Sequence, residues 1–214
     1  ALIEKYNYVP SAFKLEAIIG EYDDPSNQYQ NILKLELGNN GNTIIYGTSS
    51  TNREMFLNTL IYSLCLMHSS KEVNFYIFDF GSESLRMFKD MPQVGDIVYA
   101  SDDEKIIKLN KMIDEEISMG KKIFAEYNGE YENYCRNSGQ SLPRKIYIYN
   151  NLDSYREMYP NCDELLIKYS REGLRYGIII IITANSNSGL YGRLLRNFEN
   201  IFVLDMPTRE SYSN

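Results

Sequence analysis

The sequence has no tryptophan, and its 214 residues include only one histidine, His68, and three cysteines. With a single histidine, neither a His-dependent catalytic triad nor a multi-histidine metal site is expected. The cysteines are odd in number and share no metal-ligand spacing, so we expect reduced thiols and no metal centre. No apolar run approaches the ~20 residues of a membrane helix, because the longest is Ile178–Ile182.

An excess of positive charge is also missing, since 22 Lys and Arg residues face 29 Asp and Glu residues, for a net charge of -7. Nucleic-acid binders normally carry a basic surface, so no nucleic-acid partner is expected. The N-terminal residues lack the pattern of a secretory signal, and we expect the chain to be a piece of a longer protein. Its length and its 43% hydrophobic content are sufficient for a substantial core.

Strand-like and helix-like segments alternate along most of the chain, which predicts an α/β fold with a mostly parallel sheet and helices on both faces. The run Ile178–Ile182 is apolar on both strand faces, as in parallel sheets. We expect short antiparallel lead-in strands in residues 1–42, packed on a core domain of residues 43–214. The lead-in strands fall at 14–19 and 32–37, and the polar segment 128–142 is expected to be a loop.

A phosphate-binding loop is indicated where the predicted strand 43–46 meets the predicted helix 53–67. The usual pattern there is G-x-x-x-x-G-K-[ST], in which backbone N–H groups and the Lys hold phosphates and the hydroxyl holds Mg²⁺. In this chain Asn52 replaces the second Gly, Arg53 the Lys and Glu54 the hydroxyl residue. The candidate nucleotide-binding residues of this degenerate motif are Gly47, Thr48, Ser49, Ser50, Thr51, Asn52, Arg53 and Glu54.

The three replacements differ in their expected effect on a bound nucleotide. Asn52 tolerates left-handed backbone angles, and Arg53 keeps the positive charge in a bulkier, forked shape. Glu54 introduces repulsion of roughly 3 kcal/mol against a phosphate ~5 Å away at an effective dielectric of ~20. Thr51 and Glu54 also match a capping box, which predicts that the helix caps itself and no longer needs an anion.

Further segments complete a resemblance to a known family. Gly20–Gln28 precedes the loop, Tyr76–Leu85 leads into Met91–Gly95, and Lys145–Asp153 lies where a Walker B strand would end. Together these segments resemble FtsK/SpoIIIE-type ATPase domains, and more narrowly the EssC/EccC coupling ATPases of type VII secretion. The resemblance covers about residues 17–214 and is greatest to the second of three tandem ATPase domains, with the family's domain continuing past residue 214.

The resemblance implies a RecA-like P-loop fold in a cytoplasmic domain of a membrane-anchored secretion motor. The family uses ATP and Mg²⁺, whose binding is expected to be weak or absent here. The implied partners are neighbouring ATPase domains of the same chain and small helical secreted proteins of the WXG100 type, with the membrane reached only through the full-length protein.

Other positions of the resemblance carry altered chemistry as well. The Walker B strand ends in Asn150 and Asn151, whose amides supply neither the negative charge nor the general base of an ATPase. Asp79 ends another strand, where it either approaches the site or caps a turn. The segment Thr183–Asn185 occupies the place of a sensor, with Thr183 and Asn185 as the sensor-like residues and without the family's Gln.

Two further features leave alternatives open. Arg193 and Arg196 are either arginine fingers for a neighbouring domain or solvated surface residues. The chain has 19 tyrosines, three of which, Tyr127, Tyr131 and Tyr134, cluster near residues 128–142, and this reflects either an interface or compositional drift.

For the whole chain, three functions are open. The first is a degenerate P-loop domain that recognises a substrate or regulates a neighbour without hydrolysis. The second is an ATP-binding domain with weak turnover. The third is an active translocase of protein or DNA.

Overall fold

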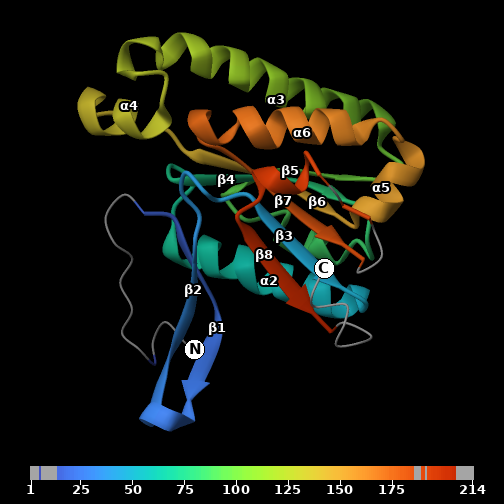
Figure 1. Cartoon of the computed structure of the whole chain (residues 1–214). Helices are drawn as coiled ribbons and strands as arrows, with labels where there is room; N and C mark the ends of the chain where they lie inside the picture. Colours follow the sequence, from blue (N-terminus) through green and yellow to red (C-terminus); the bar gives the residue numbers. More distant parts are fainter. Residues whose placement is uncertain (1–4, 6–13, 186–188, 191, 206–214) are drawn as a thin grey trace.

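The computed structural model describes residue 5 and residues 14–185, 189–190 and 192–205, and it contains a six-stranded sheet (Figure 1). The strand order is β5-β4-β6-β7-β3-β8, and all five neighbouring pairs are parallel. This confirms the predicted fold class. The strands of this sheet are β3 (Thr43–Gly47), β4 (Val73–Asp79), β5 (Val94–Tyr99), β6 (Arg144–Asn150), β7 (Ile178–Ala184) and β8 (Asn200–Leu204).

Helices cover both faces of the sheet. Helix α2 (Ser50–Met67) lies on one face, and α3 (Asp103–Ile123), α5 (Leu152–Met158) and α6 (Cys162–Glu172) lie on the other (Figure 1). Ile180 and Ile182 of β7 pack into the core under α3 and α6, whereas Ile179 and Ile181 pack into the core over α2. Because alternate side chains of a strand point to opposite faces, the unbroken isoleucine run serves two cores at once.

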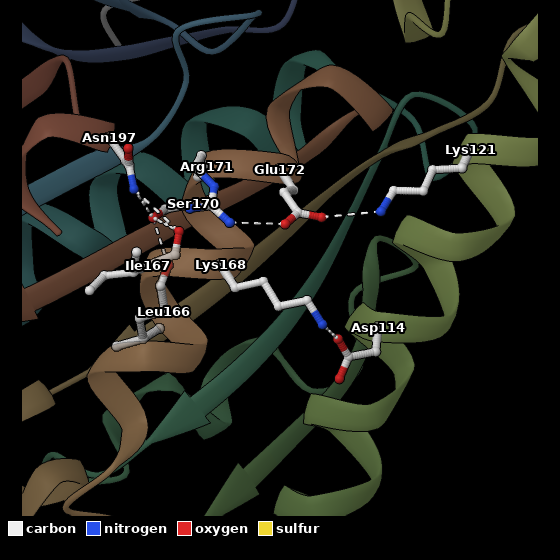
Figure 2. Close-up of polar contacts among 9 residues, drawn as sticks. All are labelled: Asp114, Lys121, Leu166, Ile167, Lys168, Ser170, Arg171, Glu172 and Asn197. Atoms are coloured by element: carbon white, nitrogen blue, oxygen red, sulfur yellow. Dashed lines mark hydrogen bonds and ion pairs between the residues drawn. The ribbon is translucent and has the colours of Figure 1, made fainter. Parts of the chain in front are cut away.

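Ion pairs join α3 and α6 along their outer surface (Figure 2). Lys168 pairs with Asp114, and Lys121 Nζ lies 3.3 Å from a Glu172 carboxylate oxygen. The described residues also form the 3₁₀ helices η1 (Pro25–Asn27), η2 (Ser84–Phe88), η3 (Ala125–Tyr127), η4 (Leu174–Tyr176) and η5 (Leu195–Asn197). None of the helices in the described ranges is both long and apolar enough to span a bilayer.

A separate antiparallel ribbon is formed by β1 (Glu16–Asp24) and β2 (Tyr29–Glu36), both longer than the predicted strands. Its base packs on α2, where the backbone N–H of Ile18 donates to Ser63 Oγ over 2.7 Å. The far end of the ribbon extends away from the sheet and is largely exposed (Figure 1).

The prediction of a loop over residues 128–142 is wrong in its central part. Helix α4 spans Tyr131–Ser138 within it, and its mostly polar sequence contains two aromatic residues. Tyr131 and Tyr134 place their rings 6.2 and 5.1 Å from the buried ring of Phe124, at the end of α3. Aromatic contacts of this kind stabilise a short helix that propensity alone does not.

Candidate functional site

The predicted motif residues converge at the carboxyl ends of four strands. Gly47 ends β3, Asn150 ends β6 and Asp79 ends β4, while Thr183 lies near the end of β7. Strand β7 separates β3 from β6, so the loop after β3 and the end of β6 meet across it. Open α/β sheets bind ligands at this edge.

The loop after β3 leads directly into α2. Ser49 is the N-cap, with extended backbone angles, and its hydroxyl accepts a 3.3 Å hydrogen bond from the Asn52 N–H. The predicted capping box of Thr51 and Glu54 is therefore wrong. The helix begins at Ser50, which places Thr51 inside the first turn and directs Glu54 elsewhere.

Arg53 is turned back onto its own loop. The residue is 5% exposed, and its guanidinium donates a short hydrogen bond to the carbonyl oxygen of Gly47. Burial lowers the pKa of the guanidinium below its usual value, an effect that the nearby Asp153 and Glu54 carboxylates oppose. The positive charge of the motif is thus held by a backbone carbonyl of the protein.

Asp205, which follows β8, accepts hydrogen bonds from two further donors of the same loop. Its carbonyl oxygen accepts from the Thr48 N–H at 3.4 Å, and its carboxylate accepts a short bond from the Asn52 side chain. The end of β8 lies so close to Gly47 that a Cβ on Gly47 would be 2.8 Å from the Leu204 carbonyl oxygen. Glycine is required at position 47 by this approach.

Glu54 points away from its helix toward the end of β4. Its carboxylate accepts from the Ser82 N–H at 2.9 Å, the Ser82 hydroxyl at 2.5 Å and the Ser84 hydroxyl at 3.0 Å, with Asn150 Nδ2 at 3.4 Å. Burial by itself raises the pKa of Glu54, but these hydrogen bonds outweigh it and hold the pKa below its usual value. These hydrogen bonds from Ser82, Ser84 and Asn150 therefore favour the ionised form of the buried Glu54 carboxylate.

Asn150 links the two buried carboxylates. Its amide nitrogen donates to Asp79 Oδ1 at 2.9 Å, and its amide oxygen accepts from the Thr183 hydroxyl at 2.7 Å. Asp79 also accepts from the Gly81 and Leu85 N–H groups, so it caps a turn as well as facing the site. Burial raises the pKa of Asp79 above its usual value, and the Glu54 charge adds to this against the hydrogen bonds.

The neighbouring Asn151 adopts left-handed backbone angles, with φ of 61°, and caps α5. Its N–H donates to the Thr183 hydroxyl at 2.8 Å, and Asp153 accepts from the Asn185 N–H at 2.8 Å. A hollow of about 400 Å³ remains between Arg53, Asn151, Asp153 and Asn185. Hydrogen bonds thus join Glu54, Asn150, Asn151 and Thr183 at one sheet edge, and Arg53 and Asn185 line the hollow beside them.

Comparison with known proteins decides the family, because residues 9–211 match the FtsK/SpoIIIE family. The chain belongs to the FtsK/SpoIIIE family. It is 28% identical over 206 residues to the type VII secretion system protein EssC of Staphylococcus aureus MRSA252, covering 95% of this chain and 14% of that protein. It is 30% identical over 186 residues to the ESX secretion system protein EccC of Geobacillus thermodenitrificans NG80-2, covering 86% and 13%.

Solved structures agree with this placement. The EssC structure of ATPases 2 and 3 from Geobacillus thermodenitrificans superposes with a TM-score of 0.85 at 28% identity, covering 96% of this chain and 40% of that one. The structure of Thermomonospora curvata EccC ATPases 2 and 3 with a signal sequence peptide gives 0.82 at 24% identity, covering 92% and 38%. The chain spans about 14% of the length of the EssC proteins that it matches.

Several residues of this FtsK/SpoIIIE site were not predicted from the sequence. Ser82, Ser84 and Gly81 follow the Asp79 strand end, and Asp205 follows β8. The signal for Gly81, Ser82 and Ser84 was the serine-rich segment directly after β4, since the end of β4 lies at the same sheet edge as Gly47. Gly81 has no room for a side chain, since a Cβ would lie 2.3 Å from a Glu54 carboxylate oxygen.

The predicted arginine fingers lie outside this polar network. Arg193 and Arg196 are exposed on the segment between β7 and β8, and their service to a neighbouring domain stays a prediction. Ser186, at the position where the family's Gln is missing, falls outside the described residues. Within the described ranges no group of three or more His, Cys, Asp and Glu side chains is arranged to hold a metal ion.

Proposed function

We propose that this chain is a hydrolysis-deficient ATPase-like domain of a membrane-anchored type VII secretion motor. It acts in the cytoplasm, in substrate recognition or in regulation between ATPase domains during protein export. The proposal is supported by similarity to EssC over 95% of the chain, which is 14% of the length of that protein. It is carried chiefly by one observation, the internal hydrogen bonding of Glu54 and Asn150 at the magnesium position.

The magnesium side of the site does not fit Mg²⁺·ATP. A P-loop ATPase presents a hydroxyl and a Walker B carboxylate to the metal. Here Glu54 replaces the hydroxyl and is surrounded by Ser82, Ser84 and Asn150, while the Asn150 amide is bonded to Asp79 and Thr183. An Mg²⁺ ion would have to break this buried network before it gained oxygen ligands, which costs free energy for every bond lost.

The phosphate side is occupied as well. The Thr48 N–H and the Asn52 amide are bonded to Asp205, and Arg53 is bonded to Gly47. A phosphate would displace Arg53 and meet the carboxylates of Glu54 and Asp205, whose negative charges repel it. Weak or absent nucleotide binding is the consequence that we propose.

A domain that has lost turnover retains its surfaces for partners. We propose that neighbouring ATPase domains of the same chain and WXG100-type secreted proteins are these partners. The EccC relative of Thermomonospora curvata was solved with a signal sequence peptide, which supports a recognition role for the EccC architecture. The net charge of -7 argues against a nucleic-acid partner.

Titration calorimetry with ATP and Mg²⁺ tests the proposal. We expect the chain to show no saturable binding below about 1 mM. The matched variant Asn52→Gly/Arg53→Lys/Glu54→Ser/Asn150→Asp restores the family's residue types, and we expect it to bind at least about tenfold more tightly. Micromolar binding by the unaltered chain, or phosphate release above background, would contradict the proposal.

A further inference from the structure

A second hollow lies at the opposite edge of the sheet, where β6 begins. Its volume is about 570 Å³, and it is enclosed by the base of the β1–β2 ribbon, the end of α2 and helix α4. The residues that matter for its chemistry are Leu15, Lys71, Tyr131, Cys135, Leu142 and Arg144. A cavity of this volume is in the range of small-molecule sites, which combine apolar walls with a few polar groups.

Arg144 is the polar group at the base of this cavity. Its side chain is buried, with 5% of the residue exposed, and its Nη2 atom lies 3.1 Å from a Glu132 carboxylate oxygen. Its Nη1 atom is buried and has no hydrogen-bond partner among the described residues. The centroid of the Tyr131 ring lies 4.6 Å from the guanidinium carbon, so the aromatic ring packs against this charged group. A buried charged donor left unpaired is unfavourable until an acceptor arrives.

The charges around the cavity favour an anionic acceptor. Glu132 is shared, because its second oxygen also faces the Arg136 guanidinium at 3.6 Å. Lys71 lines the cavity and has no ion-pair partner in the part of the chain that the structure describes. The lining thus holds four cationic side chains, Lys14, Lys71, Arg136 and Arg144, against the three carboxylates Glu36, Glu72 and Glu132. The lining therefore has one more cationic than anionic side chain, in a chain whose net charge is -7.

Part of the cavity lining is apolar. Leu15 and Leu142 line the cavity together with the ring of Tyr131, whose hydroxyl is already engaged by the Leu142 carbonyl oxygen. We propose that this cavity binds a small organic carboxylate with an aromatic or aliphatic body. The positive charges of Arg144 and Lys71 attract the carboxylate, and the body packs against the apolar walls.

This site is independent of the proposed function. No residue that lines the cavity belongs to Gly47–Glu54 or to the network around Asn150. Failure of nucleotide binding at the P-loop therefore says nothing about the cavity, and the reverse also holds.

Phenylacetate and its uncharged analogue phenylacetamide are suitable probes, because they have the same body and differ in the carboxylate. In calorimetry and ¹H–¹⁵N NMR titrations of the 214-residue chain, we expect saturable phenylacetate binding below about 10 mM. Phenylacetamide should bind about tenfold more weakly or not at all. The shifted amides should be those of α4 and the start of β6, and those of Gly47–Glu54 should stay in place.

Variants locate the binding. Arg144→Met removes the proposed anchor and should abolish saturation, whereas Arg193→Met, at an exposed position, should bind as the unaltered chain does. If Arg144→Met fails to fold by circular dichroism, Cys135→Trp decides, because a large side chain at that position fills the cavity and leaves Arg144 in place. Equal affinity for the two probes, unchanged binding in Arg144→Met or Cys135→Trp, or no saturation would each overturn the proposal.

Discussion

At the carboxyl edge of the sheet the Glu54 carboxylate accepts hydrogen bonds from Ser82, Ser84 and Asn150, whereas at the amino edge the Arg144 guanidinium keeps an unpartnered nitrogen beside a cavity. The two edges belong to the same parallel sheet and both bury charge. Only the first has the position of a family ligand site, yet its polar groups are bonded within the chain. The difference teaches that a shared position in the fold does not fix the hydrogen bonds that the residues there make.

The difference also has an energetic side. Three buried side-chain atoms in the described residues lack a hydrogen-bond partner, and none of them belongs to Gly47–Glu54 or to the network around Asn150. A fully bonded network is rigid and resists a ligand, while an incomplete one gains free energy when an acceptor enters. Perturbing each edge should therefore have effects of very different size.

Gly81→Ala should be the most destabilising single change at the carboxyl edge. Its Cβ would lie 2.3 Å from a Glu54 carboxylate oxygen and 2.6 Å from the Asn150 amide nitrogen. Neither group moves freely, because each is held by other buried bonds, so we expect a loss of about 3 kcal/mol in urea unfolding. Gly20→Ala is the control, since no heavy atom lies within 4 Å of its Cβ. Equal stability of the two variants would mean that Glu54 and Asn150 can shift to make room for a side chain at position 81.

Asn150→Asp asks whether the amide is needed between two carboxylates. The substitution removes the donor to Asp79 Oδ1 at 2.9 Å and adds a third acidic group beside Glu54. We expect a loss of about 2–3 kcal/mol at neutral pH, because like charges repel strongly in a buried site. The loss should shrink in acid, where one carboxyl is protonated.

The control for Asn150→Asp is the exposed Asn39→Asp, which should leave the free energy of unfolding within about 0.5 kcal/mol of the unaltered chain. A pH-independent loss in Asn150→Asp would contradict the electrostatic explanation, and would leave only the missing hydrogen bond.

Glu54→Gln separates the charge of Glu54 from its shape. The folded pKa of Glu54 is lowered, so its stabilisation is fully present above the ordinary carboxyl pKa and is lost as pH falls through the folded value. Asp79 has the opposite sign. Its folded pKa is raised, so its contribution is present below the ordinary value and is lost as pH rises through the folded value.

We expect Glu54→Gln to cost about 1–2 kcal/mol at neutral pH and to remove the acid-side decline that Glu54 causes. Chemical unfolding at a series of pH values between about 3 and 7 measures this. The exposed Glu115→Gln is the matched control and should follow the unaltered chain. Parallel stability curves for Glu54→Gln and the unaltered chain would show that the Glu54 charge is not what holds the edge closed.

The fold was largely predictable, because its signals are local. Alternation of strand and helix patterns and the run Ile178–Ile182 fix a parallel sheet buried on both faces. Helix α4 was missed, since the contacts of Tyr131 and Tyr134 with Phe124 stabilise a segment whose composition indicates a loop.

The site was predictable in place but not in bonding. Strand ends identified Gly47, Asn150 and Thr183, because parallel strands bring their carboxyl ends together. The direction of the Glu54 side chain was not predictable. The same sequence is compatible with a capping box and with a contact to Ser82, and the choice depends on the residue at which α2 begins. The Asn52–Asp205 bond joins residues 153 positions apart, a separation at which one sequence gives no signal.

Arg136→Gln should have the smallest effect and tests the amino edge of the sheet. Its side chain is 74% exposed, and its Nη2 atom lies 3.6 Å from Glu132, a carboxylate that Arg144 also uses. Exposed ion pairs contribute little, so we expect a change within about 0.5 kcal/mol in urea unfolding. Glu132 then serves Arg144 alone, and a phenylacetate titration should show slightly weaker binding as the cavity loses one cation. A loss of more than about 1 kcal/mol in the free energy of unfolding would show that the charges at the amino edge stabilise the fold as those around Glu54 do. The contrast between the two edges would then fail.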